Sequence, residues 1–260
     1  MKRRDFLATA SMAAIIPISS LSTADTNSSK SQLQYYELRK YILKSPEKQK
    51  LILDYLTTAE IPALNRIGIK PVGVFKMLEP DTLDLYVLLI HNSLKSVIAV
   101  SSLIDSDPQY RKDYEKLLNA PISDPAYERI NTYLLLAFEQ IPRLEIPTKA
   151  DSRIFQLRIY ESHDSIKASK KVEMFNTGGE IALFRKTGLN PVFFGRAIIG
   201  SDLPNLTYML AFDNIEQKDK CWDNFRNSAG WEKLKADPYY ADTVSKVTNI
   251  LLRPDSCSQL

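Results

Sequence analysis

The stretch Gly188–Phe212, GLNPVFFGRAIIGSDLPNLTYMLAF, reads as two apolar strands joined by a turn. Its apolar runs, Asn190–Ile199 and Leu206–Phe212, are separated by Gly, Ser, Asp, Pro and Asn, which is the pattern of a β-hairpin. A helical segment is predicted on each side, Asp164–Thr187 before the hairpin and Asn214–Asn227 after it. The stretch therefore predicts a hairpin set between two helices.

The same order of segments occurs twice in the chain, which indicates an internal duplication. Four short matches carry this interpretation, at spacings of 119, 120, 122 and 113 residues: YELRKY at 36–41 with FQLRIY at 155–160, GIKPV at 68–72 with GLNPV at 188–192, YVL at 86–88 with YML at 208–210, and DPAY at 124–127 with DPYY at 237–240. Because the matches keep their order and their offsets drift only by small insertions, chance alignment explains them poorly.

Each copy reads as βαββαβ, so we predict an α+β fold of two tandem ferredoxin-like repeats. One such sheet leaves a face uncovered, and packing two sheets face to face gives a dimeric α/β-barrel-like arrangement with the helices outside. The predicted boundaries are a signal peptide at 1–24, a disordered leader at 25–33, the first repeat at 34–138, a linker at 139–152, the second repeat at 153–254 and a tail at 255–260.

Helix ends and breaks are predicted from local chemistry. Ser45 supplies an N-cap before Pro46 at the first helical position, and Asn214 supplies another. Pro62 should break or kink the first helix, and Gly68 suits a left-handed cap. The pair Gly178-Gly179 predicts a kink in the helical stretch of the second copy, whose buried side we expect to include Ile166, Val172, Phe175, Ala182 and Leu183.

The first residues carry the features of an export signal. Lys2-Arg3-Arg4 is a twin-arginine pattern, an apolar run follows, and Ser22-Thr23-Ala24 offers small residues for cleavage. The run is too short to be a stable membrane span, so we expect a periplasmic or otherwise exported mature chain. The twin-arginine pathway exports proteins that are already folded, so the chain can leave the cell interior together with a partner protein or as a homodimer.

Composition excludes several classes of partner and site. Removal of residues 1–24 takes away a net charge of +2 from the formal +3, so the mature chain is close to neutral and its lysine clusters are interpreted as solvated faces rather than a nucleic-acid site. The two cysteines, Cys221 and Cys257, form no CxxC motif and are interpreted as free thiols, although a disulfide is allowed in an exported protein. The sequence holds no phosphate loop, dinucleotide fingerprint, nucleophile elbow or HExxH motif, and it identifies no cofactor or metal.

The second copy resembles the C-terminal domain of the NIPSNAP family over nearly all of residues 153–254. The stretches that carry the resemblance are YESH at 160–163, EMF at 173–175, GGEI at 178–181, NPVFFG at 190–195, PNLTYML at 204–210 and ADPYYAD at 236–242. The first copy is similar to the same domain more loosely. The resemblance implies a dimeric α/β-barrel fold but no defined reaction. Proteins of that fold include cofactor-free monooxygenases, haem-degrading enzymes and small-molecule-binding proteins.

Strand alternation predicts one polar surface. In the second copy Gln156, Arg158 and Tyr160 share a strand face, and in the first copy Glu37, Arg39 and Tyr41 share the equivalent face. We expect the apolar faces to lie under the helices and both polar sets to meet between the two sheets, in a pocket for an anionic or phenolic ligand. Tyr208 completes the predicted ligand-binding set. A structural Arg–Glu pair with packed tyrosines is the competing interpretation.

His163 is the candidate base, together with Arg158 and Tyr160, because it lies beside Glu161 and Asp164. A solvated histidine next to a helix cap is the competing interpretation, and His91 is interpreted as structural. The function that we predict is an exported small-molecule-binding or assembly module. The alternative is a cofactor-free oxygenase or isomerase acting on a small phenolic or anionic substrate.

Overall fold

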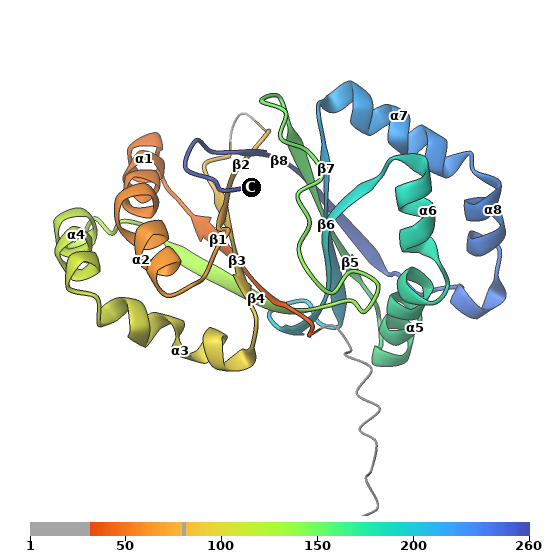
Figure 1. The fold of residues 1–260 in the computed structure, drawn as a ribbon, viewed down its shortest axis with the longest axis horizontal. Helices are drawn as coiled ribbons and strands as arrows, with labels where there is room; N and C mark the ends of the chain where they lie inside the picture. The colour runs from red at the N-terminus through yellow and green to blue at the C-terminus, as the bar shows by residue number, and fades with distance from the viewer. Residues whose placement is uncertain (1–31, 80–81) are drawn as a thin grey trace, which may run out of the picture. The chain divides into compact units, whose positions relative to one another are not determined.

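Eight antiparallel strands close into one barrel, and the helices pack around its outside (Figure 1). This is a computed structural model, and it describes residues 32–79 and 82–260. The first half contains β1 (Tyr35–Ile42), α1 (Pro46–Tyr55), the π-helix η1 (Leu56–Glu60), α2 (Ile61–Arg66), β2 (Gly73–Met77), β3 (Leu85–His91), α3 (Leu94–Asp105), α4 (Pro108–Leu118) and β4 (Arg129–Ala137). The second half contains β5 (Ile154–Glu161), α5 (Ser165–Asn176), α6 (Glu180–Thr187), β6 (Asn190–Ile199), β7 (Asn205–Phe212), α7 (Ile215–Arg226), α8 (Ala229–Lys235), the 3-10 helix η2 (Pro238–Tyr240) and β8 (Lys246–Pro254).

Strand order is the same in the two halves. Hydrogen bonding runs β4-β1-β3-β2 in the first half and β8-β5-β7-β6 in the second, and the pairs β2–β8 and β4–β6 close the ring. Helices α1–α4 cover the first half of the barrel and α5–α8 cover the second (Figure 1). The predicted barrel-like arrangement of strands, with the helices outside, is confirmed.

Large apolar side chains from both halves fill most of the barrel interior. The ring of Phe75 on β2 meets that of Phe155 on β5 at 4.9 Å, and Tyr36 on β1 meets Phe193 on β6 at 4.7 Å. Leu38 and Leu157 belong to the same cluster. Each half therefore buries the open face of the other, and this burial of apolar surface is the main force that holds the halves together.

A π-helical turn replaces the predicted break at Pro62. The helix continues from α1 through η1 into α2, and Ile61 N–H bonds to Leu56 O, five residues back. Proline has no N–H to give to the preceding turn, and the wider turn accommodates it without ending the helix. One consequence is that Glu60, the last residue of η1, points inward and is only 2% exposed. Gly68 takes the predicted left-handed conformation, with φ at +84°.

The predicted helix caps are confirmed at Ser45 and Asn214, whose side chains accept from the N–H of Lys48 and Gln217. The predicted break at Gly178-Gly179 is also confirmed, because Gly179 has φ +87° between α5 and α6.

The predicted buried face of these two helices is partly wrong. Ile166 is 69% exposed and Ala182 is also exposed, whereas Phe175 is buried as expected. The helix break changes the rotational phase of α6 relative to α5, so one continuous helical period cannot place both inner faces. The inner faces are formed by Lys171, Met174, Phe175, Glu180, Ile181 and Phe184.

The C-terminal segment packs back on the barrel. Residues 255–260, predicted as a tail, run beside β2, with Gln259 N–H bonded to Val72 O at 2.9 Å, and the Leu260 side chain lies in the interior cluster.

Cys221 and Cys257 are free thiols, as predicted. No helix of residues 32–79 and 82–260 has the length and apolarity that crossing a bilayer requires. The predicted signal peptide, leader residues 25–31 and the turn residues Pro80 and Asp81 lie outside the described residues.

Candidate functional site

The two predicted polar sets do not meet between the sheets, so that expectation is wrong. Phe155 and Leu157 point into the barrel, and the alternate residues of β5 point outward beneath α5–α8. On β1 the interior takes Tyr36 and Leu38, and the alternate residues face α1–α4. The apolar sets fill the interior because burial there removes the most apolar surface from water. Each polar set lies under the helices of its own half.

In the first half, Arg39 lies between two buried carboxylates. Its Nε donates to Glu37 Oε1 at 2.6 Å and its Nη1 donates to Glu60 Oε1 at 2.7 Å. Glu37 comes from the same strand, two residues away, and Glu60 comes from the π-helix η1. Tyr41 also donates to Glu60, with its hydroxyl 3.4 Å from Oε2. The π-turn that places Glu60 here is of a kind that recurs at functional sites.

A histidine extends this cluster into the interior of the fold. His91 is fully buried at the end of β3, with Nε2 3.2 Å from Glu37 Oε2 and Nδ1 3.0 Å from Ser96 Oγ. The carboxylate of Glu37 can only accept, so Nε2 carries a proton and Ser96 faces Nδ1. His91 therefore has the structural role that was predicted for it, but it also orients Glu37.

Electrostatics hold this cluster in charged form. Burial alone would raise the pKa of Glu37, but hydrogen bonding to His91 and the charge of Arg39 outweigh burial and lower it. Burial likewise opposes the charge of Arg39, and the carboxylates of Glu60 and Glu37 raise its pKa. Burial and the neighbouring carboxylate of Glu60 raise the pKa of Tyr41. The site thus presents an ionised carboxylate, a guanidinium and a neutral phenol side by side.

A pocket of about 400 Å³ opens over this cluster, between the barrel wall and α1–α4. Glu37, Arg39 and Glu60 line it together with five tyrosines, and we call it the tyrosine pocket: Tyr41, Tyr55, Tyr110, Tyr114 and Tyr127. The rings stand at 5.8–6.4 Å from their nearest neighbours, and the hydroxyls of Tyr55 and Tyr110 are 2.8 Å apart. Burial raises the pKa of Tyr110 to about 12, so its hydroxyl is a hydrogen-bond donor at neutral pH.

In the second half the corresponding space is occupied by protein side chains. Trp222 of α7 donates from Nε1 to Gln156 Oε1 at 2.6 Å, and its ring lies 4.7 Å from the guanidinium carbon of Arg158. The ring of Tyr160 approaches the same guanidinium at 5.3 Å, and Tyr208 donates to the Tyr160 hydroxyl at 3.0 Å. Four of the predicted ligand-binding residues, Gln156, Arg158, Tyr160 and Tyr208, are thus brought together, but under a tryptophan.

A lysine takes the place of an arginine as the partner of the helix carboxylate in the second half. Glu180 lies 120 residues after Glu60, at the spacing of the repeat. Its carboxylate bonds to Lys171 Nζ at 2.7 Å, and both side chains are almost fully buried. Burial raises the pKa of Glu180, against the charge of Lys171. Lys171 Nζ also lies 4.5 Å from the Phe175 ring. The second half therefore contains a closed counterpart of the tyrosine pocket.

The candidate base His163 is not part of either cluster. It lies in the loop after β5, about half exposed, and its Nε2 lies 3.3 Å from Oδ2 of the adjacent Asp164. Asp164 caps α5 by accepting from Lys167 N–H, which is the competing interpretation given above for this loop. Within the described part of the chain, no group of three or more His, Cys, Asp or Glu is placed to hold a metal ion.

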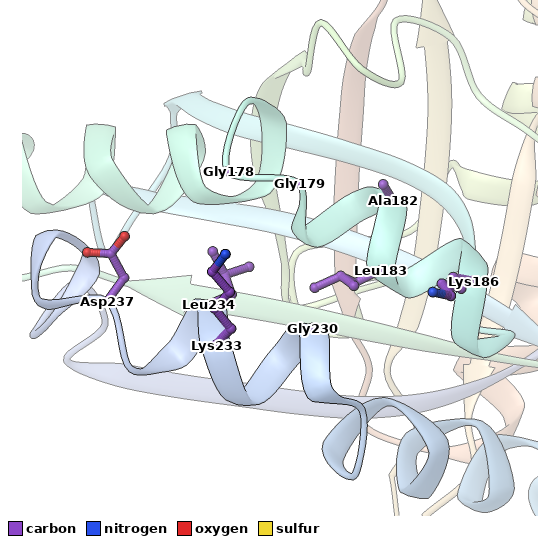
Figure 2. A pocket seen from close by; sticks show the side chains of 9 residues that line it. All are labelled: Gly178, Gly179, Ala182, Leu183, Lys186, Gly230, Lys233, Leu234 and Asp237. Carbon is purple, nitrogen blue, oxygen red and sulfur yellow. The ribbon is translucent and has the colours of Figure 1, made fainter.

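A second hollow, of about 430 Å³, lies on the outside of the second half between the α5–α6 turn and α8 (Figure 2). Gly178 and Gly179 form one wall and Gly230 the other, and Lys186, Lys233 and Asp237 are its charged residues. These charged side chains are exposed, so water and salt screen them, and none of the predicted site residues lines this hollow. The tyrosine pocket, with its buried ionised groups, is the stronger candidate site.

Sequence reasoning missed Glu60, Lys171 and Glu180, and it did not foresee that His91 orients Glu37. A signal existed for two of them, since Glu60 and Glu180 are followed by similar apolar residues at the repeat spacing of 120. A carboxylate inside a predicted amphipathic helix looks like a solvated residue unless its helical phase is known, and the π-turn and the glycine break both shift that phase.

Two comparisons with known proteins gave matches, one to a family model over the second half of the chain and one to solved structures over most of the barrel. The NIPSNAP family model matches residues 155–259. A protein of Fusobacterium nucleatum subsp. nucleatum ATCC 25586, provisionally described as a monooxygenase, is similar in structure, with a TM-score of 0.57, 11% identity, and coverage of 86% of this chain and 93% of its own. A second protein provisionally described as a monooxygenase, from Lactobacillus acidophilus NCFM, is similar at a TM-score of 0.56 and 11% identity, with coverage of 85% of this chain and 94% of its own.

An anthrone oxidase-like protein is similar at a TM-score of 0.52 and 9% identity, with coverage of 87% of this chain and 93% of its own. A search of curated proteins gave no match to the sequence. At these identities the similar structures establish the fold alone. The sequence match to the NIPSNAP family model is confined to residues 155–259.

Proposed function

We propose that the tyrosine pocket binds a small aromatic molecule that carries a hydroxyl or carbonyl oxygen. The observation that carries this proposal is the placement of Arg39, whose Nε and Nη1 are held by Glu37 and Glu60 while the guanidinium lines the pocket. The two carboxylates fix the side chain and leave Nη2 for a ligand. A preorganised guanidinium binds an oxygen without losing much side-chain entropy.

The rest of the pocket suits the same ligand. Tyrosine rings offer flat apolar contact to an aromatic ring at little entropic cost, and their hydroxyls serve as donors or acceptors. The Glu37 carboxylate can accept a hydrogen bond from a phenolic hydroxyl, and the Tyr110 hydroxyl can donate one to its oxygen. At about 400 Å³ the pocket falls within the range of small-molecule sites.

Substitution of Arg39 by lysine tests the proposal. The ammonium keeps the charge between Glu37 and Glu60 but loses the planar fork that reaches the ligand. With a panel of hydroxyaromatics and their saturated ring counterparts, calorimetry should detect binding of the aromatic members only. Arg39→Lys should then weaken binding about tenfold or more, because a hydrogen bond to a charged group contributes ~1.5–3 kcal/mol.

Arg158→Lys is the matched control, since Arg158 occupies the same place in the second half under Trp222. It should leave the affinity unchanged. Loss of binding in Arg158→Lys with none in Arg39→Lys would contradict the proposed pocket and favour the residues predicted from sequence as the site. Equal binding of the aromatic ligands and their saturated counterparts would also contradict the proposal.

A second candidate is a cofactor-free oxygenase or isomerase at the same pocket. The specific observation is that Glu37 is an ionised carboxylate oriented by buried His91, which is the arrangement of a general base. Glu37 would take a proton from an acidic C–H of the substrate. As an oxygenase, the electron pair left on carbon adds to O2, and the carbon-bound peroxide takes the proton back from Glu37. Loss of water, which removes a second hydrogen from the same carbon, then leaves a carbonyl. As an isomerase, the proton returns to another carbon. Among the proteins of similar fold, one is provisionally described as a monooxygenase and another as anthrone oxidase-like. The oxygenase candidate belongs to the same class of reaction as these descriptions.

Oxygen uptake and deuterium exchange separate these outcomes. With a hydroxyaromatic ligand that binds, an oxygenase consumes O2, and an isomerase incorporates deuterium from heavy water without O2 uptake. Glu37→Gln should abolish either signal and retain ligand binding. The originally predicted set of His163, Arg158 and Tyr160 would be favoured instead if His163→Gln abolished turnover.

We further propose that the two halves are tandem ferredoxin-like repeats from one duplicated unit. The matching motifs, the common strand order and the pairing of Glu60 with Glu180 at the repeat spacing support this proposal. Under this proposal the first copy has kept an open pocket, and in the second copy Trp222 and Lys171 fill the equivalent space. Opening the second pocket by Trp222→Ala, which should let a hydroxyaromatic reach Arg158, tests the equivalence.

For the cellular setting, we propose export through the twin-arginine pathway, on the order of Lys2-Arg3-Arg4, apolar run and Ser22-Thr23-Ala24. Arg3→Lys with Arg4→Lys should retain the chain in the cytoplasmic fraction of a twin-arginine host, and unchanged export would contradict it. The assembly role stays open to a homodimer or a co-exported partner, and exposed Leu94 and Ile98 on α3 offer an apolar surface for either.

A further inference from the structure

The apolar core leaves a cavity at one end of the barrel. This cavity has a volume of about 280 Å³ and is separate from the tyrosine pocket, since the two share no lining residue. Its floor is formed by Leu38 and Ile250, which belong to the interior cluster, and by Ile159 of β5. Its rim carries two lysines and two carboxylates, Lys40, Lys246, Glu161 and Asp202, and we call this site the barrel mouth.

Strand register places the two sides of the barrel mouth opposite each other. Lys40 on β1 lies between Tyr86 on β3 and Asn131 on β4. Glu161 on β5 lies between Asn205 on β7 and Lys246 on β8. Strands β1 and β5 are four steps apart in the ring of eight, and Lys40 and Glu161 line the same cavity from these two strands. Both halves contribute to the site.

The lysines have hydrogen-bond donors to spare. Lys40 Nζ pairs with Asp84 at 2.9 Å, and Lys246 Nζ pairs with Glu161 at 2.8 Å. An ammonium has three donors, so each lysine can serve a second acceptor. Burial works against the charge of Lys40, but Asp84 and Tyr86 raise its pKa, and Glu161 raises the pKa of Lys246. Both stay cationic at neutral pH.

We propose that the barrel mouth binds a small amphipathic monocarboxylate, with its carboxylate between Lys40 and Lys246 and its apolar chain on Leu38, Ile159 and Ile250. A polar rim over an apolar floor matches a ligand with one charged end. The cavity lies just below the usual volume of drug-sized sites, which restricts the ligand to a short chain or a single ring. A carboxylate can accept charge-assisted hydrogen bonds from both ammonium groups.

Octanoate, octanol and octylamine are the probes, because they share a chain and differ in the charge of the head. Titration of full-length protein, followed by calorimetry and by the methyl NMR signals of Leu38, Ile159 and Ile250, should show octanoate binding at least tenfold tighter than the other two. Lys40→Met and Lys246→Met should each weaken octanoate binding about tenfold, the loss expected for one charge-assisted hydrogen bond.

Lys44→Met is the matched control, since Lys44 forms an exposed pair with Glu128 away from the barrel mouth. It should leave octanoate affinity unchanged, and urea unfolding of every variant shows whether the fold is intact. Ile159→Trp fills the floor and should abolish binding without removing a charge. Equal affinity for the three probes, preference for octylamine, or loss of octanoate binding in Arg39→Lys but not in Lys40→Met would overturn the proposal.

Discussion

Replacing Arg39 with methionine is expected to lower the free energy of unfolding by about 3–5 kcal/mol at neutral pH, which is the usual cost of leaving buried charge without its partner. The guanidinium is the cation that holds both Glu37 and Glu60, at 2.6 and 2.7 Å, and Glu60 is almost fully buried. Methionine fills similar space, so little of the loss comes from a cavity. Equilibrium urea unfolding measures it.

The loss should shrink as the pH is lowered from 7 towards 4. In the intact protein the pKa of Glu37 is lowered, so its contribution is present above the unfolded pKa of about 4.3 and is lost as pH falls through the folded value. Without Arg39 burial favours the protonated acid, and acid pH removes the unpaired charge. Arg66→Met is the control, because its pair with Asp107 is partly exposed and is expected to contribute less than about 1 kcal/mol. Equal losses in the two variants would show that the buried cluster contributes no more than a surface pair.

The architecture could be predicted because it depends on local patterns that repeat. The hairpin at 190–212, the capped helices and the order of the elements all follow from period, capping residues and glycine or proline. The duplicated motifs add the expectation that two sheets cover each other, and the closed ring of strands fulfils it. These features need no knowledge of which side of a strand faces which layer.

The facing of the strands could not be predicted, because both faces of every sheet are covered. Alternation shows that Gln156, Arg158 and Tyr160 share a face, but it does not say whether that face points to the interior or to the helices. The polar-in assignment assumed that the helix layer is the more apolar one. In the structure, Phe155 and Leu157 take the interior, and the polar set meets Trp222 and Lys171 under the helices.

The residues that contact the polar sets could not be predicted either, because they depend on a π-turn and on strand register that the sequence pattern does not determine. Glu60 reaches Arg39 only because the π-turn rotates it inward, and His91 reaches Glu37 because β1 and β3 pair in one register. Lys40 and Glu161 of the barrel mouth lie on the strand faces opposite to the predicted polar sets, and no prediction was made for them.

Replacing Lys171 with methionine is expected to be about as costly as the change at Arg39, ~3–5 kcal/mol at neutral pH. Lys171 and Glu180 form a pair at 2.7 Å that is nearly sealed from water, so Glu180 would be left as a lone buried carboxyl. The double variant Lys171→Met with Glu180→Leu should regain most of the stability, because a well-packed apolar pair avoids the desolvation of both charges. Urea unfolding of the single and double variants gives the coupling between the two side chains.

The deficit of Lys171→Met should change with pH in the same direction as that of Arg39→Met, but for a different reason. Burial raises the pKa of Glu180 in the folded chain, so this group costs stability as pH rises from the unfolded value of about 4.3 to the folded one. Loss of Lys171 raises that pKa further, so the deficit of Lys171→Met should be smallest near pH 4 and grow with pH. Lys50→Met, which removes an exposed i,i+4 pair with Asp54, should cost about 0.5 kcal/mol or less throughout. A deficit in Lys171→Met that did not change with pH, or a double variant no better than the single one, would mean that packing around the lysine stem, and not its charge, stabilises this half of the barrel.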